Sequence, residues 1–178
     1  MPGRASGRCC RGVVALGNVL RAGTAAGTVL LLRLDPLLYE AALDQLERRW
    51  PVGTPGGAGA VYLDDGMILT SVGLDNVNGG VTLCGETGAI CQAYTLNRRI
   101  TASIFLYRES GGEPYVMAPC GTCQERLALW GPDVEVAVPD SDSPAGWSAR
   151  TLADVHPYYW AKVFAGGEWP PASLHIEP

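Results

Sequence analysis

Basic residues are scarce in this sequence of 178 residues. Lys and Arg together number 13 against 18 Asp and Glu, which gives a formal net charge of −5. Proteins that bind nucleic acids concentrate Lys and Arg on one face in order to neutralise phosphates. The charge balance therefore argues against a polynucleotide partner and favours a small molecule.

The sequence also lacks a long hydrophobic run. No stretch approaches the roughly 18 uninterrupted apolar residues that a membrane span needs. Three arginines near the N-terminus precede a mildly apolar stretch at residues 13–20, but Asn18 interrupts it and no clear cleavage site follows. We therefore expect a soluble, cytoplasmic protein with no membrane partner.

Cysteine is too sparse and too clustered for a disulfide framework. The chain has six Cys. Because 47% of its residues are hydrophobic, a single domain of this size can build a core without disulfide bonds. Four of the cysteines fall in local pairs, Cys9-Cys10 and Cys120-x-x-Cys123. This spacing favours a reduced protein that binds a metal.

The chain divides into two parts. Residues 1–33 are rich in Gly, Ala and Arg without helical or strand periodicity, which predicts a disordered leader. Residues 34–178 are predicted to form a single domain with an aromatic-rich C-terminal extension. We expect order to begin at Asp35-Pro36, because an acidic N-cap followed by Pro is typical of a helix start.

The residue patterns then predict an alternation of helices and strands. The expected helices lie at 36–49, 84–96 and 120–130, and the expected strands at 58–63, 67–72, 102–108 and 134–138, with a short lead-in at 115–117. Asp64-Asp65-Gly66 predicts a tight turn between the first two strands. This order describes an α/β fold with helices on the faces of a mixed sheet.

Two short motifs carry the candidate chemistry. Cys84-Gly85-Glu86 stands at the start of one predicted helix, and Pro119-Cys120-Gly121-Thr122-Cys123 at the start of another. A catalytic Zn²⁺ usually has three protein ligands and one open position, and thiolates are good ligands for it. Ligands in the first turn of a helix also lie near the positive end of its dipole, which favours the thiolate. Cys84, Cys120 and Cys123 are therefore the predicted metal ligands.

Glu86 is the predicted catalytic residue. It follows the first ligand by two positions, so its carboxylate can reach the open coordination position and move protons there. Zinc deaminases have this layout, in which a His or Cys is followed by x-Glu and later by Pro-Cys-x-x-Cys.

Two other interpretations of the cysteines stay open at this point. A structural zinc site would need a fourth ligand, for which Cys91, His156 and His175 are candidates, although Cys91 lies two helical turns from Cys84. A redox dithiol would need only Cys120 and Cys123. Neither a structural zinc site nor a redox dithiol requires a carboxylate at the position of Glu86.

Residues 35–140 resemble the cytidine deaminase superfamily, most closely its small cytidine deaminases and blasticidin S deaminase. The specific part lies in residues 70–86 and 118–127, which contain both cysteine motifs. The resemblance implies a three-layer fold with a mixed five-stranded sheet flanked by helices. It also implies zinc on Cys84, Cys120 and Cys123, Glu86 as proton shuttle, and a homodimer or homotetramer.

The implied reaction is the hydrolytic deamination of a cytosine-type nucleoside, such as cytidine, deoxycytidine or blasticidin S. Family members that bind ribose carry Asn-Val-Glu-Asn where this chain reads Gly73-Leu74-Asp75-Asn76, so a donor is lost and an acid is shortened. We expect Asp75, Asn76 and Pro119 to contact the substrate, although Asp-Asn after a strand is also common turn chemistry. Guanine, adenine or a pterin stays open as an alternative substrate, and a non-catalytic structural zinc protein as an alternative function.

Overall fold

The computed structural model describes residues 34–170, so the predicted leader at residues 1–33 lies outside the described residues. Helix α1 spans Pro36–Arg49, and the Asp35 carboxylate accepts a hydrogen bond from the backbone N–H of Leu38 at 3.1 Å. This cap confirms the predicted helix start. Leu38, Ala42 and Leu46 are spaced four residues apart and are all buried, because they form one face of the helix.

The predicted hairpin is also present. Strand β1 spans Gly56–Leu63 and β2 spans Ile68–Val72, and they pair antiparallel around the turn at Asp64-Asp65-Gly66. Gly66 has a φ of +85°, a left-handed conformation that glycine adopts at little cost. A 3₁₀ turn, η1, follows at Gly79–Val81.

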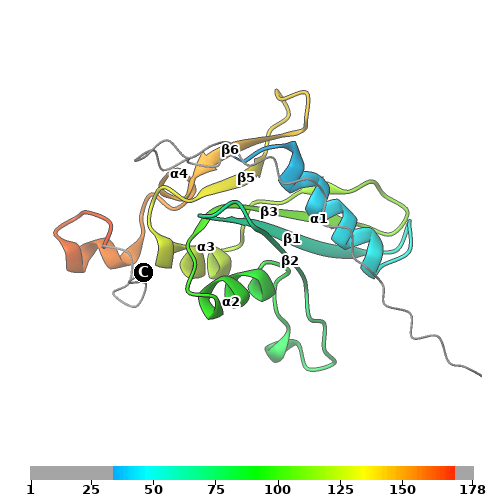
Figure 1. Cartoon of the computed structure of the whole chain (residues 1–178), viewed down its shortest axis with the longest axis horizontal. Coiled ribbons are helices and arrows are strands. Elements are labelled where there is room, and N and C mark those ends of the chain that lie inside the picture. Colours follow the sequence, from blue (N-terminus) through cyan, green and yellow to red (C-terminus); the bar gives the residue numbers. More distant parts are fainter. Residues whose placement is uncertain (1–33, 171–178) are drawn as a thin grey trace, which may run out of the picture.

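A six-stranded mixed sheet forms the centre of the molecule (Figure 1). The strand order is β2-β1-β3-β5-β6, with β4 paired to β3 beside this path. The remaining strands are β3 at Ile100–Arg108, β4 at Tyr115–Val116, β5 at Glu135–Pro139 and β6 at Trp147–Thr151. Only β3 and β5 pair in parallel. The sheet has one strand more than the five that we expected.

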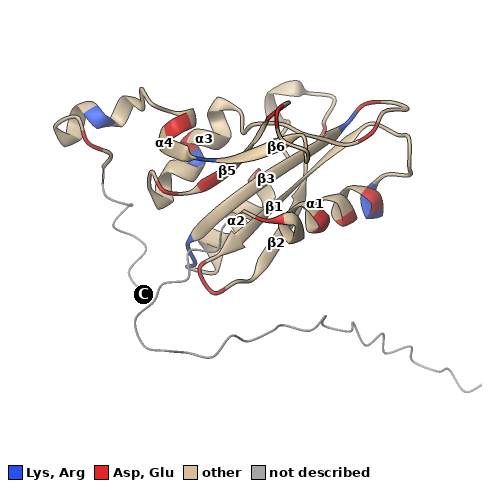
Figure 2. Ribbon diagram, turned by 90° about the horizontal axis from the view of Figure 1, so that it is seen from above, with Lys and Arg blue, Asp and Glu red and all other residues tan. Residues whose placement is uncertain are grey.

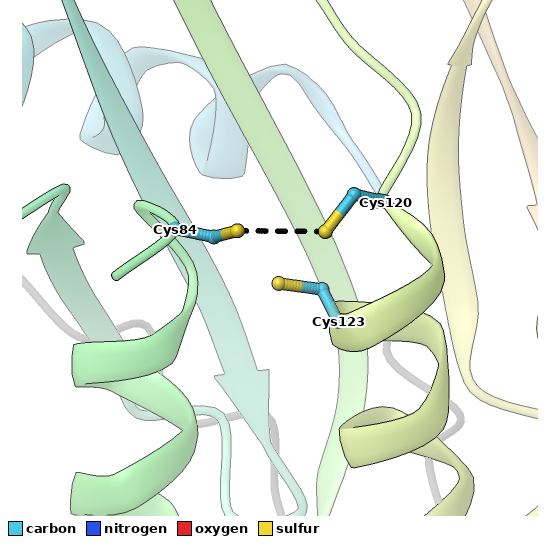
Figure 3. A group of neighbouring side chains, drawn as sticks. All are labelled: Cys84, Cys120 and Cys123. Atoms are coloured by element: carbon cyan, nitrogen blue, oxygen red, sulfur yellow. Dashed lines mark hydrogen bonds between the residues drawn. The ribbon is translucent and has the colours of Figure 1, made fainter. Parts of the chain in front are cut away.

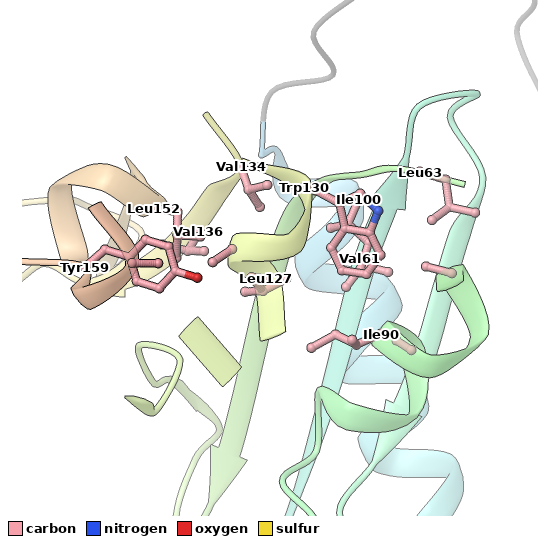
Figure 4. Packing of buried hydrophobic residues seen from close by; sticks show 14 residues of the cluster. Val61, Leu63, Ile90, Ile100, Leu127, Trp130, Val134, Val136, Leu152 and Tyr159 are labelled. Atoms are coloured by element: carbon pink, nitrogen blue, oxygen red, sulfur yellow. The ribbon is translucent and has the colours of Figure 1, made fainter. Parts of the chain in front are cut away.

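Helices cover both faces of this sheet and make three layers, as predicted. Helix α1 packs on one face over Ala60, Ile104 and Leu106. Helix α2, Thr87–Thr95, and helix α3, Gly121–Leu127, lie on the other face (Figure 1). A second apolar cluster fills the space beneath them, and Figure 4 shows its packing around Val61, Ile90 and Leu127.

The C-terminal extension has more regular structure than the sequence predicted. Beyond β6, this extension forms α4 at Leu152–Val155 and η3 at Trp160–Ala165. The 3₁₀ turn η2, at Ala128–Trp130, lies earlier in the chain and directly follows α3. Tyr159 packs into the core beside Leu152 and stacks on Trp169 with ring centroids 4.5 Å apart. The aromatic rings therefore anchor this segment to the domain.

The basic residues of the described part of the chain are spread among acidic ones. Figure 2 shows Lys and Arg at scattered positions of residues 34–170, among Asp and Glu. Within the same residues, no helix is long and apolar enough to cross a membrane.

Candidate active site

Three cysteines from two segments of the chain lie close together where helices α2 and α3 begin. Cys84 lies in the turn before α2, Cys120 is the N-cap of α3, and Cys123 is in the first turn of α3. Their Sγ atoms all lie within 4.8 Å of one another, and Figure 3 shows them pointing toward a common centre. The Sγ atoms of Cys84 and Cys120 are 3.4 Å apart.

This donor set suits a zinc ion. Zn–S bonds of about 2.3 Å in a tetrahedron place the sulfurs about 3.8 Å apart, which the cluster matches with small adjustments. No fourth Cys, His, Asp or Glu among residues 34–170 joins the group. Cys91 is exposed and His156 packs against Tyr159 and Trp169, whereas His175 lies outside the described residues. The cluster therefore offers three ligands and leaves a coordination position open.

The thiols have different acidities in the metal-free chain. Burial raises the pKa of Cys84 and of Cys123, and the negative charge of Glu86 raises both further. Burial also acts on Cys120, but hydrogen bonds from the backbone N–H groups of Cys123 and Thr122 and from the neighbouring thiols outweigh it and lower the pKa. The N-cap position of α3 thus favours the thiolate of Cys120, and a bound cation would deprotonate all three coordinating thiols.

Glu86 is a buried carboxylate next to this cluster. Only 3% of its surface is exposed, and it is the N-cap residue of α2. Burial raises the pKa of Glu86, while a hydrogen bond from the Cys123 thiol and the positive charge of Arg126 partly offset the shift. A raised pKa makes the carboxylate a stronger proton acceptor than an exposed glutamate, which suits a group that moves protons.

Two glycines allow the backbone of Glu86 to approach the sheet. A Cβ atom on Gly59 of β1 would lie 3.1 Å from the Cα of Glu86 and 3.2 Å from the carbonyl oxygen of Gly85. A Cβ atom on Gly85 would overlap the ring of Phe105. The close approach therefore requires residues without side chains at both positions.

A cavity of about 320 Å³ opens beside the cluster. Its lining residues are Cys84, Gly85, Glu86, Phe105, Tyr107, Tyr115, Met117, Ala118 and Cys120. This volume is within the range of small-molecule sites. A larger cavity of about 860 Å³ lies between α2, α3 and Tyr159, and none of the three clustered cysteines lines it.

Solved structures of cytidine deaminases resemble this chain over most of its length. The enzyme from Bacillus anthracis is 38% identical with a TM-score of 0.68, and the match covers 74% of this chain and 92% of that one. The enzyme from Mycobacterium leprae is 25% identical with a TM-score of 0.54, over 68% of this chain and 96% of that one. The chain belongs to the cytidine deaminase superfamily.

The matches found by sequence comparison alone cover a smaller share of the chain. The cytidine deaminase of Mycobacterium tuberculosis is 35% identical over 69 residues, which are 38% of this chain and 49% of that protein. The chain thus spans about half the length of the relatives that it matches in sequence. No family model matches the chain.

One detail of the predicted cytidine deaminase site was wrong. We expected Cys84 inside the first turn of a helix, but α2 begins at Thr87, and the backbone N–H of Thr87 donates to the carbonyl of Cys84 at 3.0 Å. Glu86, not Cys84, therefore occupies the helix N-terminus. The dipole argument agrees with the lowered pKa of Cys120, the N-cap of α3, whereas burial raises the pKa of Cys123 in the first turn of that helix.

None of the three expected substrate contacts, Asp75, Asn76 and Pro119, lines the cavity. Asp75 and Asn76 are exposed on the loop after β2 and do not line it. The Asn76 side chain accepts a hydrogen bond from the N–H of Asn78 at 3.1 Å, which is turn chemistry. Pro119 is buried, and its carbonyl accepts a hydrogen bond from the Gln124 side chain at 2.8 Å.

Four cavity residues were not predicted from the sequence: Phe105, Tyr107, Tyr115 and Met117. A signal was present in part, because Phe105 and Tyr107 alternate along β3 and so share a face of the sheet. Which face borders the cavity depends on the pairing of β3 with β1 and β4, and the local sequence does not encode that pairing.

Proposed function

We propose that this protein is a zinc-dependent deaminase that converts a cytosine-type nucleoside to its uracil form with release of ammonia. One observation carries the proposal: three cysteine sulfurs lie within 4.8 Å of one another beside a buried carboxylate and a small cavity. The relatives named above are cytidine deaminases, which supports the same reaction here.

The chain's own residues have distinct roles in this proposal. Cys84, Cys120 and Cys123 hold the zinc, which supplies a Lewis acid that makes water a nucleophile near neutral pH. Glu86 accepts a proton from the attacking water and delivers it to the ring nitrogen. It then takes the proton of the added hydroxyl group and gives it to the departing amine as the carbonyl forms. Burial suits Glu86 to both steps because it raises the pKa of the carboxyl.

A purely structural zinc site accounts for fewer of the observations. Such a site is closed by four protein ligands, whereas this cluster has three among residues 34–170. It also gives no reason for a buried Glu86 beside the open position. The scattered basic residues likewise support a small substrate in preference to a polynucleotide (Figure 2).

Ammonia release by the purified, zinc-loaded protein tests the proposal. The substrates to compare are cytidine, deoxycytidine, cytosine, cytidylate, blasticidin S, adenosine and guanine. We expect turnover of a cytosine compound that stops when a chelator removes zinc. Turnover of adenosine or guanine alone would replace the cytosine assignment, and no turnover of any compound would contradict the proposal. Light scattering on the same sample tests the proposed homodimer or homotetramer.

A further inference from the structure

One side of the active-site cavity is built from large, mostly apolar side chains. Phe105 and Tyr107 come from β3, Tyr115 comes from β4, and Met117 follows it. We call these four residues the aromatic wall. Tyr107 and Tyr115 are paired across the two strands, and their rings meet edge to face with centroids 6.0 Å apart. Such pairs hold each other's orientation, so the wall is preformed.

The backbone next to the Phe105 ring is formed by glycines, which have no side chain. Gly59 and Gly57 of β1 lie opposite Phe105 and Tyr107 in the strand register. A Cβ atom on Gly57 would lie 2.5 Å from the Cζ atom of Phe105, and one on Gly85 would also overlap this ring. The Phe105 ring therefore occupies space that these glycines leave free, directly beside the Gly85-Glu86 segment.

Polar groups that recognise a sugar are few in this cavity. Apart from Glu86 and the cysteines, only the hydroxyls of Tyr107 and Tyr115 can form side-chain hydrogen bonds among the described lining residues. The Tyr115 hydroxyl already donates to Glu109 at 3.3 Å. Gly73 has no polar side chain, and Asp75 lies outside the lining residues.

The positions of Glu86 and the three cysteines determine how a substrate lies against the aromatic wall. The carbon that carries the amine must lie beside Glu86 and the cysteines, so the rest of the molecule extends along the aromatic wall. Sugar hydroxyls there would lose water and find few hydrogen-bond partners besides the tyrosine hydroxyls, which is unfavourable. An apolar or aromatic substituent would instead stack on Phe105 and the two tyrosines.

We propose that this site accepts cytosine-type compounds with an apolar or aromatic group on the ring at least as well as those with a polar sugar, with Phe105 as the main specificity-determining residue. The proposal rests on the deaminase function proposed above. It assigns the aromatic wall to the substituent and predicts that sugar hydroxyls contribute little to recognition.

The test compares kcat/KM for cytidine and for 1-benzylcytosine. We expect the parent protein to use 1-benzylcytosine at least as well as cytidine. Phe105→Ala should lower kcat/KM for 1-benzylcytosine by about tenfold or more, the usual scale for removing one aromatic stacking partner, and for cytidine by less than about threefold. Phe164→Ala is the matched control, because Phe164 is 80% exposed and does not line the cavity. Phe105→Leu keeps most of the volume without the ring face and replaces Phe105→Ala if that variant does not fold.

The outcomes separate the two proposals. A parent that favours cytidine over 1-benzylcytosine by more than about tenfold would overturn the aromatic-wall proposal and leave the deaminase function intact. Equal losses for both substrates in the Phe105 variants would also overturn it, because the ring would then support the fold alone. A parent that deaminates neither compound would overturn the aromatic-wall proposal, and it would contradict the deaminase function itself if the other compounds named under the proposed function were also left unchanged.

Discussion

At the residue scale, Glu86 combines burial with a place beside three thiols. A buried carboxylate is unfavourable unless it is paired or holds a proton, so a residue kept for stability alone would be apolar here. Glu86 is nearly inaccessible, and burial raises its pKa while Arg126 and the Cys123 thiol partly offset the shift. These properties fit a group that alternates between its protonated and ionised forms during a reaction.

Glu86→Gln tests this role directly. The amide has the same size but cannot accept the proton of water, so we expect zinc to stay bound while kcat falls by about 10² or more. Elemental analysis measures the zinc, and ammonia release measures kcat. Glu47→Gln, on the exposed side of α1, should change neither. Activity of Glu86→Gln within a few-fold of the parent would show that Glu86 is not the proton shuttle.

Gly59 determines how close Glu86 lies to the sheet. Gly59→Ala adds a methyl group 3.1 Å from the Cα of Glu86, so the Glu86 backbone must shift by a few tenths of an ångström. We expect kcat to fall by about three- to tenfold, because small misplacements of reacting groups slow catalysis, and stability to fall by about 1–3 kcal/mol. Gly79→Ala, which meets no atom within 4 Å, is the control. Parent-like kcat in Gly59→Ala would mean that the backbone contact does not position Glu86.

At the element scale, the predictability of the helices and strands follows from how local their causes are. The start of α1 was predicted because Asp35 and Pro36 act within one turn. The start of α2 was not, because the apolar composition of residues 84–96 does not show that helical bonding begins only at Thr87. Strand β6 was missed because its residues form a strand by pairing with β5, which is a tertiary contact.

The same distinction applies to the site. The grouping of Cys84, Cys120 and Cys123 could be predicted because zinc chemistry requires those residue types at short spacing, and their role as ligands stays a prediction, as does the role of Glu86. The aromatic wall was not predicted, because Phe105 and Tyr115 meet the cavity only through strand pairing. Asp75 and Asn76 were placed by resemblance, and the structure shows them on an exposed loop.

Helices α2 and α3 are joined by one side-chain hydrogen bond near the site. Arg126 of α3 donates from Nη1 to the hydroxyl of Thr87, the first residue of α2, at 2.8 Å. Thr87→Val and Arg126→Met each remove one partner, and we expect each to lower the free energy of unfolding by about 1 kcal/mol. A double-mutant cycle measured by denaturant unfolding should give a coupling of about 0.5 kcal/mol or more. Additive effects would show that this bond does not link the helices.

At the scale of the whole molecule, the proposed metal site connects segments far apart in the chain. The turn before α2 and the start of α3 meet through Cys84 and Cys120, which are 36 residues apart in sequence. The two helices otherwise share few contacts, so a shared ion would be a main connection between them. A ligand that binds only the folded state stabilises it by mass action.

Zinc should therefore control stability as well as activity. At a free zinc concentration 1,000 times Kd, the gain is about 4 kcal/mol, or about 8–16 °C in Tm for a chain of this size. We expect chelation to lower Tm by this amount, and elemental analysis to find about one zinc per chain in the parent.

Cys120→Ala should lose the zinc and melt like the chelated parent, because two thiolates bind the ion poorly. Cys91→Ala removes an exposed cysteine outside the cluster and should keep both the zinc and the Tm. Full zinc content in Cys120→Ala would contradict the ligand assignment, whereas zinc loss without a change in Tm would show that the ion serves the reaction but not the fold.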